Sequence, residues 1–173
     1  MKCILILLVV LNFGNYSLAC SCQDPGTVQQ GLEYSDMVVH GTVLNRSYVT
    51  YRATMKQEKG DSLNVVFSNR EADLFNSELI LKIELEVSKV YKGEMVSDTV
   101  VIYTGRSSAA CGFSWFTEGE DYIIYGTSVS YAYGLFTYED GLEQNNTFWT
   151  NHCTRTTEYN EQEAKELEGL MTE

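Results

Sequence analysis

The stretch 78–91, ELILKIELEVSKVY, predicts one long β-strand in which hydrophobic and polar side chains alternate. One face carries the hydrophobic side chains Leu79, Leu81, Ile83, Leu85 and Val87. The other face carries Lys82, Glu84, Glu86 and Ser88. A period of two residues is typical of a strand that is buried on one face and exposed on the other.

Four shorter segments also have strand character, and they are residues 37–44, 99–103, 122–125 and 131–138. They are rich in β-branched and aromatic residues, which strands favour. Polar turns separate them from one another and from the long strand. Five short strands with polar turns predict a mainly β domain built as a small barrel or sandwich.

Two helices are expected, one near each end of the mature chain. Residues 27–34 predict a short helix, and its inward-facing side chains would be Val28, Leu32 and Tyr34. A second helix is expected after Asn160, whose side chain can cap the first turn, with Glu163 completing an Asn-x-x-Glu capping pattern. Its hydrophobic stripe, made of Ala164, Leu167 and Leu170 or Met171, is expected to pack on the core.

A long polar stretch, residues 45–77, interrupts the strand pattern. The charged run 56–61 is typical of a solvated loop tip. Residues 48–54 and 64–67 would then form the two arms of a projecting hairpin. A connection of this length inside a compact domain is often functional or mobile.

Residues 1–19 have the pattern of a secretory signal peptide. Lys2 precedes an apolar run at 4–11, and Ser17 and Ala19 place small residues at the cleavage site. The run is too short to span a bilayer, which takes about 20 apolar residues. Cleavage would leave one domain, residues 20–173; the alternative is a bacterial lipoprotein acylated at Cys20.

The mature chain would be strongly acidic. Losing Lys2 with the leader takes the formal charge from −12 to −13. Nucleic acids and anionic membranes are bound through basic patches, so neither is an expected partner.

Four cysteines remain after cleavage: Cys20, Cys22, Cys111 and Cys153. An even number in a secreted chain predicts two disulfides. A Cys20–Cys22 bond would close a tiny strained ring, so one long-range bond from each is expected; no CxxC pair supports the alternative of a zinc–thiolate site. Two bonds beside the new N-terminus would make its free α-amine and carbonyl a rigid two-point ligand for a metal ion.

Motifs of common enzymes are not found in the sequence. There is no Gly-x-Ser-x-Gly, no phosphate-binding glycine loop and no His-Glu-x-x-His. His40 and His152 are expected to have structural or surface roles, and Asn45 and Asn145 match the N-glycosylation pattern. The chain is therefore not expected to be an enzyme, nor to need a cofactor or metal of its own.

Several local motifs occur together in a familiar order. Mature Cys-Ser-Cys is followed by Asp24-Pro25, a short helix and the strand start SDMVV at 35–39. Ala110-Cys111-Gly112, the strand FTEGEDYIIY at 116–125 and Cys-Thr-Arg-Thr at 153–156 come later. Over residues 20–171 the sequence resembles the N-terminal domain of the tissue inhibitors of metalloproteinases and, more broadly, the netrin-like module.

This resemblance implies a five-stranded OB-type barrel with flanking helices and the disulfides Cys20–Cys111 and Cys22–Cys153. It also implies that the α-amine and carbonyl of Cys20 chelate the catalytic zinc of a protease in trans. Ser21 would enter the adjacent specificity pocket. The remaining contacts would come from Cys22, Gln23, Asp24, Ala109 and Ala110. The implied partner is a secreted or cell-surface zinc metalloprotease, and the inhibitor is expected to be a monomer.

Two features of classical family members are not found here: a third disulfide, whose first cysteine would fall near Leu32, and a separate C-terminal domain. A second hypothesis is therefore a non-inhibitory netrin-like module that binds another protein, with lipid anchoring at Cys20 as a variant of this hypothesis. A third is a small hydrolase with an unrecognised site. In each case the expected location is extracellular, or the periplasm or cell surface of a bacterium.

Overall fold

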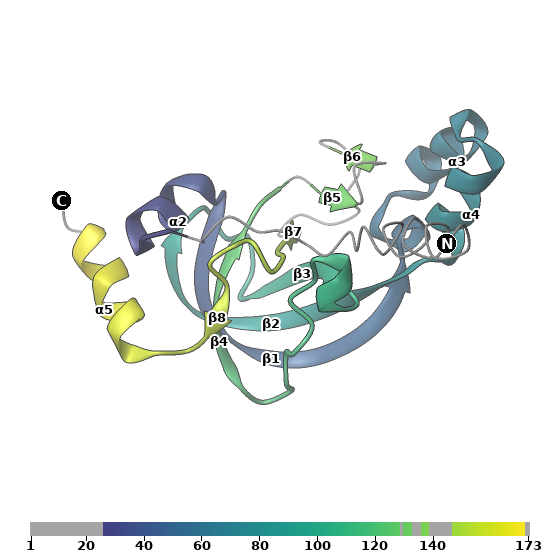
Figure 1. The fold of residues 1–173 in the computed structure, drawn as a ribbon. Helices are drawn as coiled ribbons and strands as arrows, with labels where there is room; N and C mark the ends of the chain where they lie inside the picture. Colours follow the sequence, from purple (N-terminus) through teal and green to yellow (C-terminus); the bar gives the residue numbers. More distant parts are fainter. Residues whose placement is uncertain (1–25, 129, 133–135, 139–146, 172–173) are drawn as a thin grey trace, which may run out of the picture.

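In the computed structural model, the residues described are 26–128, 130–132, 136–138 and 147–171. A six-stranded sheet forms the body, in the order β7-β3-β2-β1-β4-β8. Its strands are β1 (Met37–Thr50), β2 (Leu79–Lys92), β3 (Thr99–Gly105), β4 (Asp121–Gly126), β7 (Thr147–Trp149) and β8 (Thr157–Glu158). The pairing is antiparallel except between β3 and β7, and the sheet curls into a half-barrel (Figure 1).

The two longest strands form the centre of the sheet. β1 pairs with β2 from Val38 opposite Lys92 to Thr50 opposite Leu79, with three irregularities of register along the way. One irregularity lies at Gly41, where an added Cβ would come within 2.4 Å of the carbonyl oxygen of Glu86. A residue without a side chain is therefore needed where the two backbones approach this closely.

Three hydrophobic clusters account for the buried side chains. The largest fills the concave side of the curled sheet: Met37, Val39, Val43, Leu81, Ile83, Leu85, Val100, Ile102, Phe113, Phe116, Tyr122 and Ile124. The expected alternation along β2 is thus confirmed for Leu81, Ile83 and Leu85. Leu79, however, is exposed, and its neighbour Ile80 is buried on the other face in a second cluster.

The expected fold class is confirmed only at a coarser level, as a mixed sheet curled into a half-barrel with flanking helices. The single strand expected at 131–138 is wrong: β5 (Ser130–Ala132) and β6 (Phe136–Tyr138) pair with each other as a separate two-stranded sheet. Two very short strands, β7 and β8, complete the main sheet instead. The body therefore has six strands rather than five.

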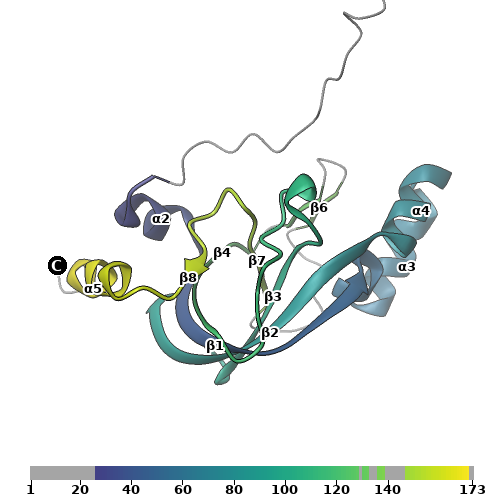
Figure 2. The ribbon, with the colours of Figure 1, turned by 60° about the horizontal axis from the view of Figure 1, so that its bottom comes forward.

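The hairpin expected between residues 45 and 77 is also wrong. β1 continues to Thr50 and is followed by the 3₁₀ turn η1 (Tyr51–Thr54) and two helices, α3 (Gln57–Val66) and α4 (Asn69–Ser77). A reciprocal capping box between Ser68 and Glu71 starts α4. We call residues 51–77 the helical projection, because both views show it extending from one end of the half-barrel (Figure 2).

The two terminal helices lie at the opposite end of the half-barrel from the helical projection (Figures 1 and 2). The predicted helices are confirmed as α2 (Val28–Tyr34) and α5 (Glu161–Leu170), capped by Thr27 and Asn160. The third cluster joins them to the sheet and contains Val28, Val38, Tyr91, Ile123, Tyr125, Ala164 and Leu167. Tyr34 and Met171, expected to face inward, are exposed. Within the described residues, no helix is both long and apolar enough to cross a bilayer.

Candidate functional site

Cys111 lies in a tight turn directly after β3. The short 3₁₀ turn η2 (Ser108–Ala110) ends at Cys111, which adopts the left-handed conformation with φ of 55°. The N–H of Cys111 donates to the carbonyl of Ser108 at 3.0 Å, and the N–H of Gly112 donates to that of Ser107 at 2.9 Å. Ala109 is exposed on this turn, two residues before the cysteine.

The turn is pressed against the end of β3. A Cβ at Gly112 would lie 1.8 Å from the carbonyl oxygen of Gly105, so only glycine allows this approach. The N–H of Phe113 donates to the buried hydroxyl of Thr104 at 2.9 Å. These contacts fix the position of Cys111 relative to the sheet.

Cys153 lies in a loop that is hydrogen-bonded to the Cys111 turn. The N–H of His152 donates to the carbonyl of Cys111 at 2.7 Å, although the two residues are far apart in sequence. The side-chain oxygen of Asn151 accepts from the N–H groups of Cys153 and Thr154, at 2.7 and 3.1 Å. The structure therefore brings Cys111 and Cys153 together; we call these two residues and their turns the cysteine platform.

Cys111 and Cys153 both take part in disulfide bonds. The predicted partners Cys20 and Cys22 lie outside the described residues, and so do Ser21, Gln23 and Asp24. The disulfide pairing and the contacts of residues 20–24 thus stay predictions. Ala110 belongs to η2, next to Cys111.

Trp115 lies beside the cysteine platform and was missed by the sequence analysis. Its side chain is partly exposed. Its ring meets that of His152 edge-on, with centroids 5.3 Å apart, and packs at the same distance against Phe113. His152 thus has the structural role expected of it, and Trp115 adds an aromatic surface next to the platform.

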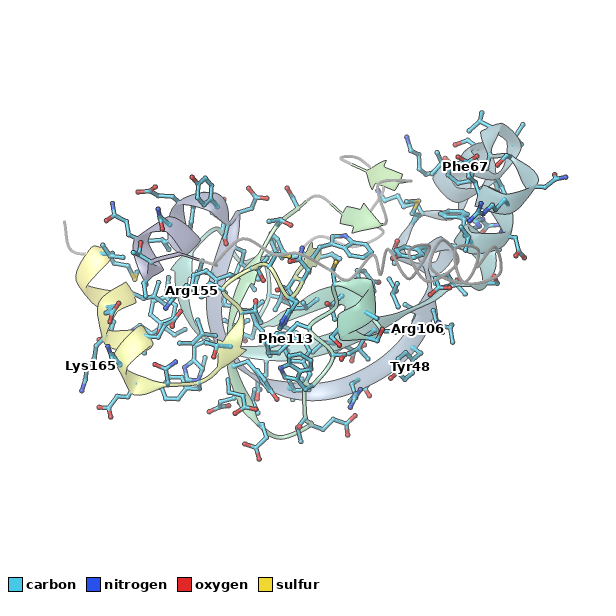
Figure 3. All side chains as sticks on the ribbon, viewed as in Figure 1. Tyr48, Phe67, Arg106, Phe113, Arg155 and Lys165 are labelled. Atoms are coloured by element: carbon cyan, nitrogen blue, oxygen red, sulfur yellow. The ribbon has the colours of Figure 1, made fainter. Side chains whose placement is uncertain are left out.

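A buried ionic network is centred on Arg155, two residues after Cys153, and was not predicted from the sequence; Figure 3 labels Arg155. The guanidinium of Arg155 donates to both oxygens of Glu163, through Nε at 2.8 Å and Nη2 at 3.1 Å. The hydroxyl of buried Tyr125 donates to Glu163 at 2.7 Å. Burial, and then this hydrogen bond to the carboxylate, raises the pKa of Tyr125. The remaining Arg155 donor reaches the carbonyl of Gly26.

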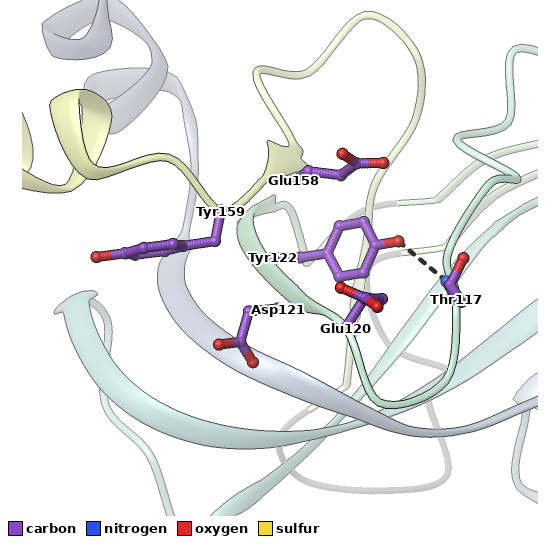
Figure 4. Close-up of a pocket in the computed structure, with 6 residues that line it drawn as sticks. All are labelled: Thr117, Glu120, Asp121, Tyr122, Glu158 and Tyr159. Carbon is purple, nitrogen blue, oxygen red and sulfur yellow. Dashed lines mark hydrogen bonds between the residues drawn. The ribbon is translucent and has the colours of Figure 1, made fainter.

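A shallow pocket of about 440 Å³ lies where β4 meets β8 (Figure 4). It is lined by Thr117, Glu120, Asp121, Tyr122, Glu158 and Tyr159. Tyr122 contributes to the wall while its hydroxyl accepts from the N–H of Thr117 at 3.0 Å. The ring of His40 stacks on that of Tyr159, with centroids 4.3 Å apart. Among the described residues, no three His, Cys, Asp or Glu side chains are grouped to hold a metal ion.

Two comparisons with known proteins bear on this site. A family model described as "Tissue inhibitor of metalloproteinase" matches residues 18–134. The match covers more than half of the chain, including the Cys111 turn. A search of curated proteins finds no match.

Proposed function

Because the chain belongs to the tissue inhibitor of metalloproteinase family, we propose that its secreted form, beginning at Cys20, inhibits a zinc metalloproteinase. Members of this family are inhibitors and not enzymes. Family membership also implies a metalloproteinase as the target. In the proposed mechanism, the α-amine and the carbonyl of Cys20 chelate the catalytic zinc of the protease.

The observation that carries the proposal is the cysteine platform. The two Cα atoms of a disulfide lie about 4.4–6.8 Å apart. In an extended segment, the Cα atoms of residues 20 and 22 would lie about 7 Å from each other, so each cysteine needs an anchoring partner of its own and the two partners must be neighbours. Two neighbouring anchoring cysteines therefore suit a Cys-x-Cys segment, which would be held at both of its cysteines. The proposed bonds are Cys20–Cys111 and Cys22–Cys153, and both anchoring residues are disulfide-bonded in the structure.

The chemistry of such an end suits a protease zinc. A catalytic zinc keeps one coordination position open for water or substrate. The amine must be neutral to bind, and the ordinary pKa of an α-amine, about 7.7–8.0, leaves a usable neutral fraction near pH 7. A ligand already fixed in its bound geometry avoids much of the ordering cost of association.

The remaining proposed contacts are those that the family resemblance implies. Ser21 would enter the specificity pocket beside the zinc, and Gln23 and Asp24 would lie along the substrate cleft. Ala109, exposed on the Cys111 turn, and Ala110 would contact the other side of the cleft. Their small side chains predict fewer contacts than bulky residues would make, so the affinity depends mainly on the N-terminal segment.

The test is to change only the N-terminus. Mature protein beginning at Cys20 is compared with a variant carrying one additional alanine before it, and with a control carrying the same alanine after Glu173. We expect the mature protein and the control to inhibit zinc endopeptidases in a panel assay, and the N-terminal extension to abolish inhibition. Mass spectrometry of each product verifies the free amine, and mapping under non-reducing conditions gives the disulfide pairing.

Failure of the mature protein to slow any protease at micromolar concentration would end the inhibitor proposal. A diacylglyceryl mass on Cys20 would end it too, because acylation removes the metal-binding amine.

One observation supports a second candidate function, a protein-binding module. Val65 and Val66 at the end of α3 are 84% and 73% exposed, side by side on the helical projection. Binding through this projection would be unchanged by the N-terminal extension and lost on changing both valines to serine. Inhibition of a protease through Cys20 would instead be lost on the N-terminal extension and unchanged when both valines become serine.

A further inference from the structure

Arg155 contacts the point where the N-terminal segment joins the body. Gly26 directly precedes Thr27, the cap of α2, and its carbonyl accepts from Nη1 of Arg155. Arg155 itself lies two residues after Cys153, in the loop of the cysteine platform. One loop therefore carries both the proposed partner of Cys22 and the side chain that binds Gly26.

Glu163 fixes the orientation in which the guanidinium of Arg155 donates to Gly26. Glu163 is 7% exposed and accepts from two of its nitrogens in a bidentate pair, which fixes the plane of the group. The stem of Arg155 packs against α2: a Cβ at Gly31 would lie 3.0 Å from its Cδ and 2.9 Å from the ring of Tyr125.

The loop that carries Arg155 is itself fixed by a set of threonine hydroxyls. Thr150 bonds to Thr154 at 2.7 Å and to Thr156 at 2.6 Å. The hydroxyl of Thr156 accepts from the N–H of Tyr125 at 3.0 Å, in the interior. Cys153 and Arg155 are thereby held in a constant relation to β4.

We propose that Arg155 is a positioning residue for the inhibitory end, because its hydrogen bond to Gly26 sets the direction in which residues 20–25 leave the body. This inference rests on the proposed function. The Cys22–Cys153 bond would fix one end of the five-residue span 22–26, and Arg155 fixes the other. Each residue left free would have to be ordered on binding, at a cost in conformational entropy.

The side-chain chemistry predicts which variant separates this role from general stability. Arg155→Lys keeps a positive charge beside Glu163, but a single ammonium cannot reproduce the planar fork that serves Glu163 and Gly26 together. A second variant, Arg155→Met with Glu163→Met, removes the bond to Gly26 without leaving an unpaired buried charge. Lys165→Met, in an exposed pair with Glu161 on the same helix, is the matched control.

Two measurements are made on the mature, disulfide-bonded protein: amide hydrogen exchange by peptide, and the inhibition constant against a zinc endopeptidase. For Arg155→Lys we expect exchange in residues 21–27 to become about 10-fold faster and the inhibition constant to rise about 10-fold. Such a rise corresponds to about 1.4 kcal/mol. Exchange in α5 should stay at its wild-type rate, and Lys165→Met should change neither measurement. The double variant is expected to repeat both effects if Arg155→Lys does not fold.

The results separate the two proposals. Wild-type exchange in 21–27 together with an unchanged inhibition constant would overturn the positioning role, and so would equal acceleration in α5. If the wild-type protein inhibits no protease but residues 21–27 still exchange faster in Arg155→Lys, the positioning role stands and the proposed function fails.

Discussion

The helices at the two ends of the half-barrel are attached to the sheet in different ways. An arginine at each end illustrates the difference. Arg155 at the α2–α5 end and Arg52 in the helical projection both have side chains that are 24% exposed. Both donate to a carboxylate and to a backbone carbonyl. The side chain of Glu163 is 8% exposed, however, whereas that of Asp61 is 64% exposed.

The hydrophobic clusters at the two ends differ in composition, and the one at the α2–α5 end is mainly aliphatic. The helical projection meets the sheet through an aromatic cluster that includes Tyr51, Phe75, Tyr103 and Trp149. Phe75 is the buried residue of α4, and Gly60 that of α3. The α2–α5 end therefore adds a buried polar network to its hydrophobic cluster, whereas the projection combines an aromatic anchor with an exposed ion pair. The following substitutions test this distinction.

Phe75→Ala should have the largest effect. Removing a fully buried phenylalanine typically costs about 3–5 kcal/mol. Because Phe75 joins α4 to the sheet, we expect the loss to appear first as faster amide exchange in α3 and α4, with α5 unaffected. Urea unfolding followed by tryptophan fluorescence, to which Trp115 and Trp149 both contribute, gives the free energy of unfolding. Phe67→Ala, a partly buried neighbour whose ring lies 5.3 Å from that of Phe75, is the control and should cost less. A cost below 1 kcal/mol for Phe75→Ala would mean that the projection is held by other contacts.

Glu163→Ala and Asp61→Ala form a matched pair. Removing one partner of a buried ion pair typically costs about 3–5 kcal/mol, while an exposed pair contributes about 0–1 kcal/mol. Since Arg155 is partly solvated, we expect about 3 kcal/mol for Glu163→Ala and less than about 1 kcal/mol for Asp61→Ala. Thermal and urea unfolding measure both. Equal costs would show that the buried network does not distinguish the two ends.

The parts of the fold that were predicted correctly have strong local patterns. β2 shows two-residue alternation over most of its length, and α2 and α5 have N-caps and hydrophobic stripes of their own. β7 and β8 have three and two residues, too few to show a period, and exist because they pair with β3 and β4. Their positions depend on contacts between distant segments, which local patterns do not show.

The helices of the projection were missed although a signal was present. Ser68 and Glu71 have the spacing of a capping box, but the polar composition of the stretch favoured a loop. The cysteine count and the family resemblance predict Cys111 and Cys153 as anchoring residues, and this role stays a prediction. The role of Arg155 could not be predicted, because Gly26 lies 129 residues away in the sequence and contacts Arg155 only in the folded chain.

Thr156→Val should have an intermediate effect on the α2–α5 end. Its hydroxyl accepts from the N–H of Tyr125, and the valine would leave this buried donor without a partner. An unsatisfied buried group costs about 1–3 kcal/mol, so we expect about 2 kcal/mol in urea unfolding. Thr157→Val, at the more exposed next position, is the control and should stay within about 0.5 kcal/mol. Equal costs for the two variants would show that the hydroxyl of Thr156 does not stabilise the α2–α5 end.

The smallest effect is expected at the start of α4 and depends on pH. The N–H of Ser68 donates to the Glu71 carboxylate at 2.8 Å, and this bond, followed by the Ser68 hydroxyl, lowers the pKa of Glu71. A carboxyl whose pKa is lower in the folded state stabilises the fold above its unfolded pKa, near 4.3, and loses that contribution as the pH falls through the folded value. Wild type should therefore melt above Glu71→Gln at pH 7, with the difference disappearing near pH 3. Because Glu71 is exposed, the difference in melting temperature should be small. It should come from the helical projection, where Glu71 lies. An equal difference in melting temperature at both pH values would mean that the carboxylate charge contributes nothing to the cap.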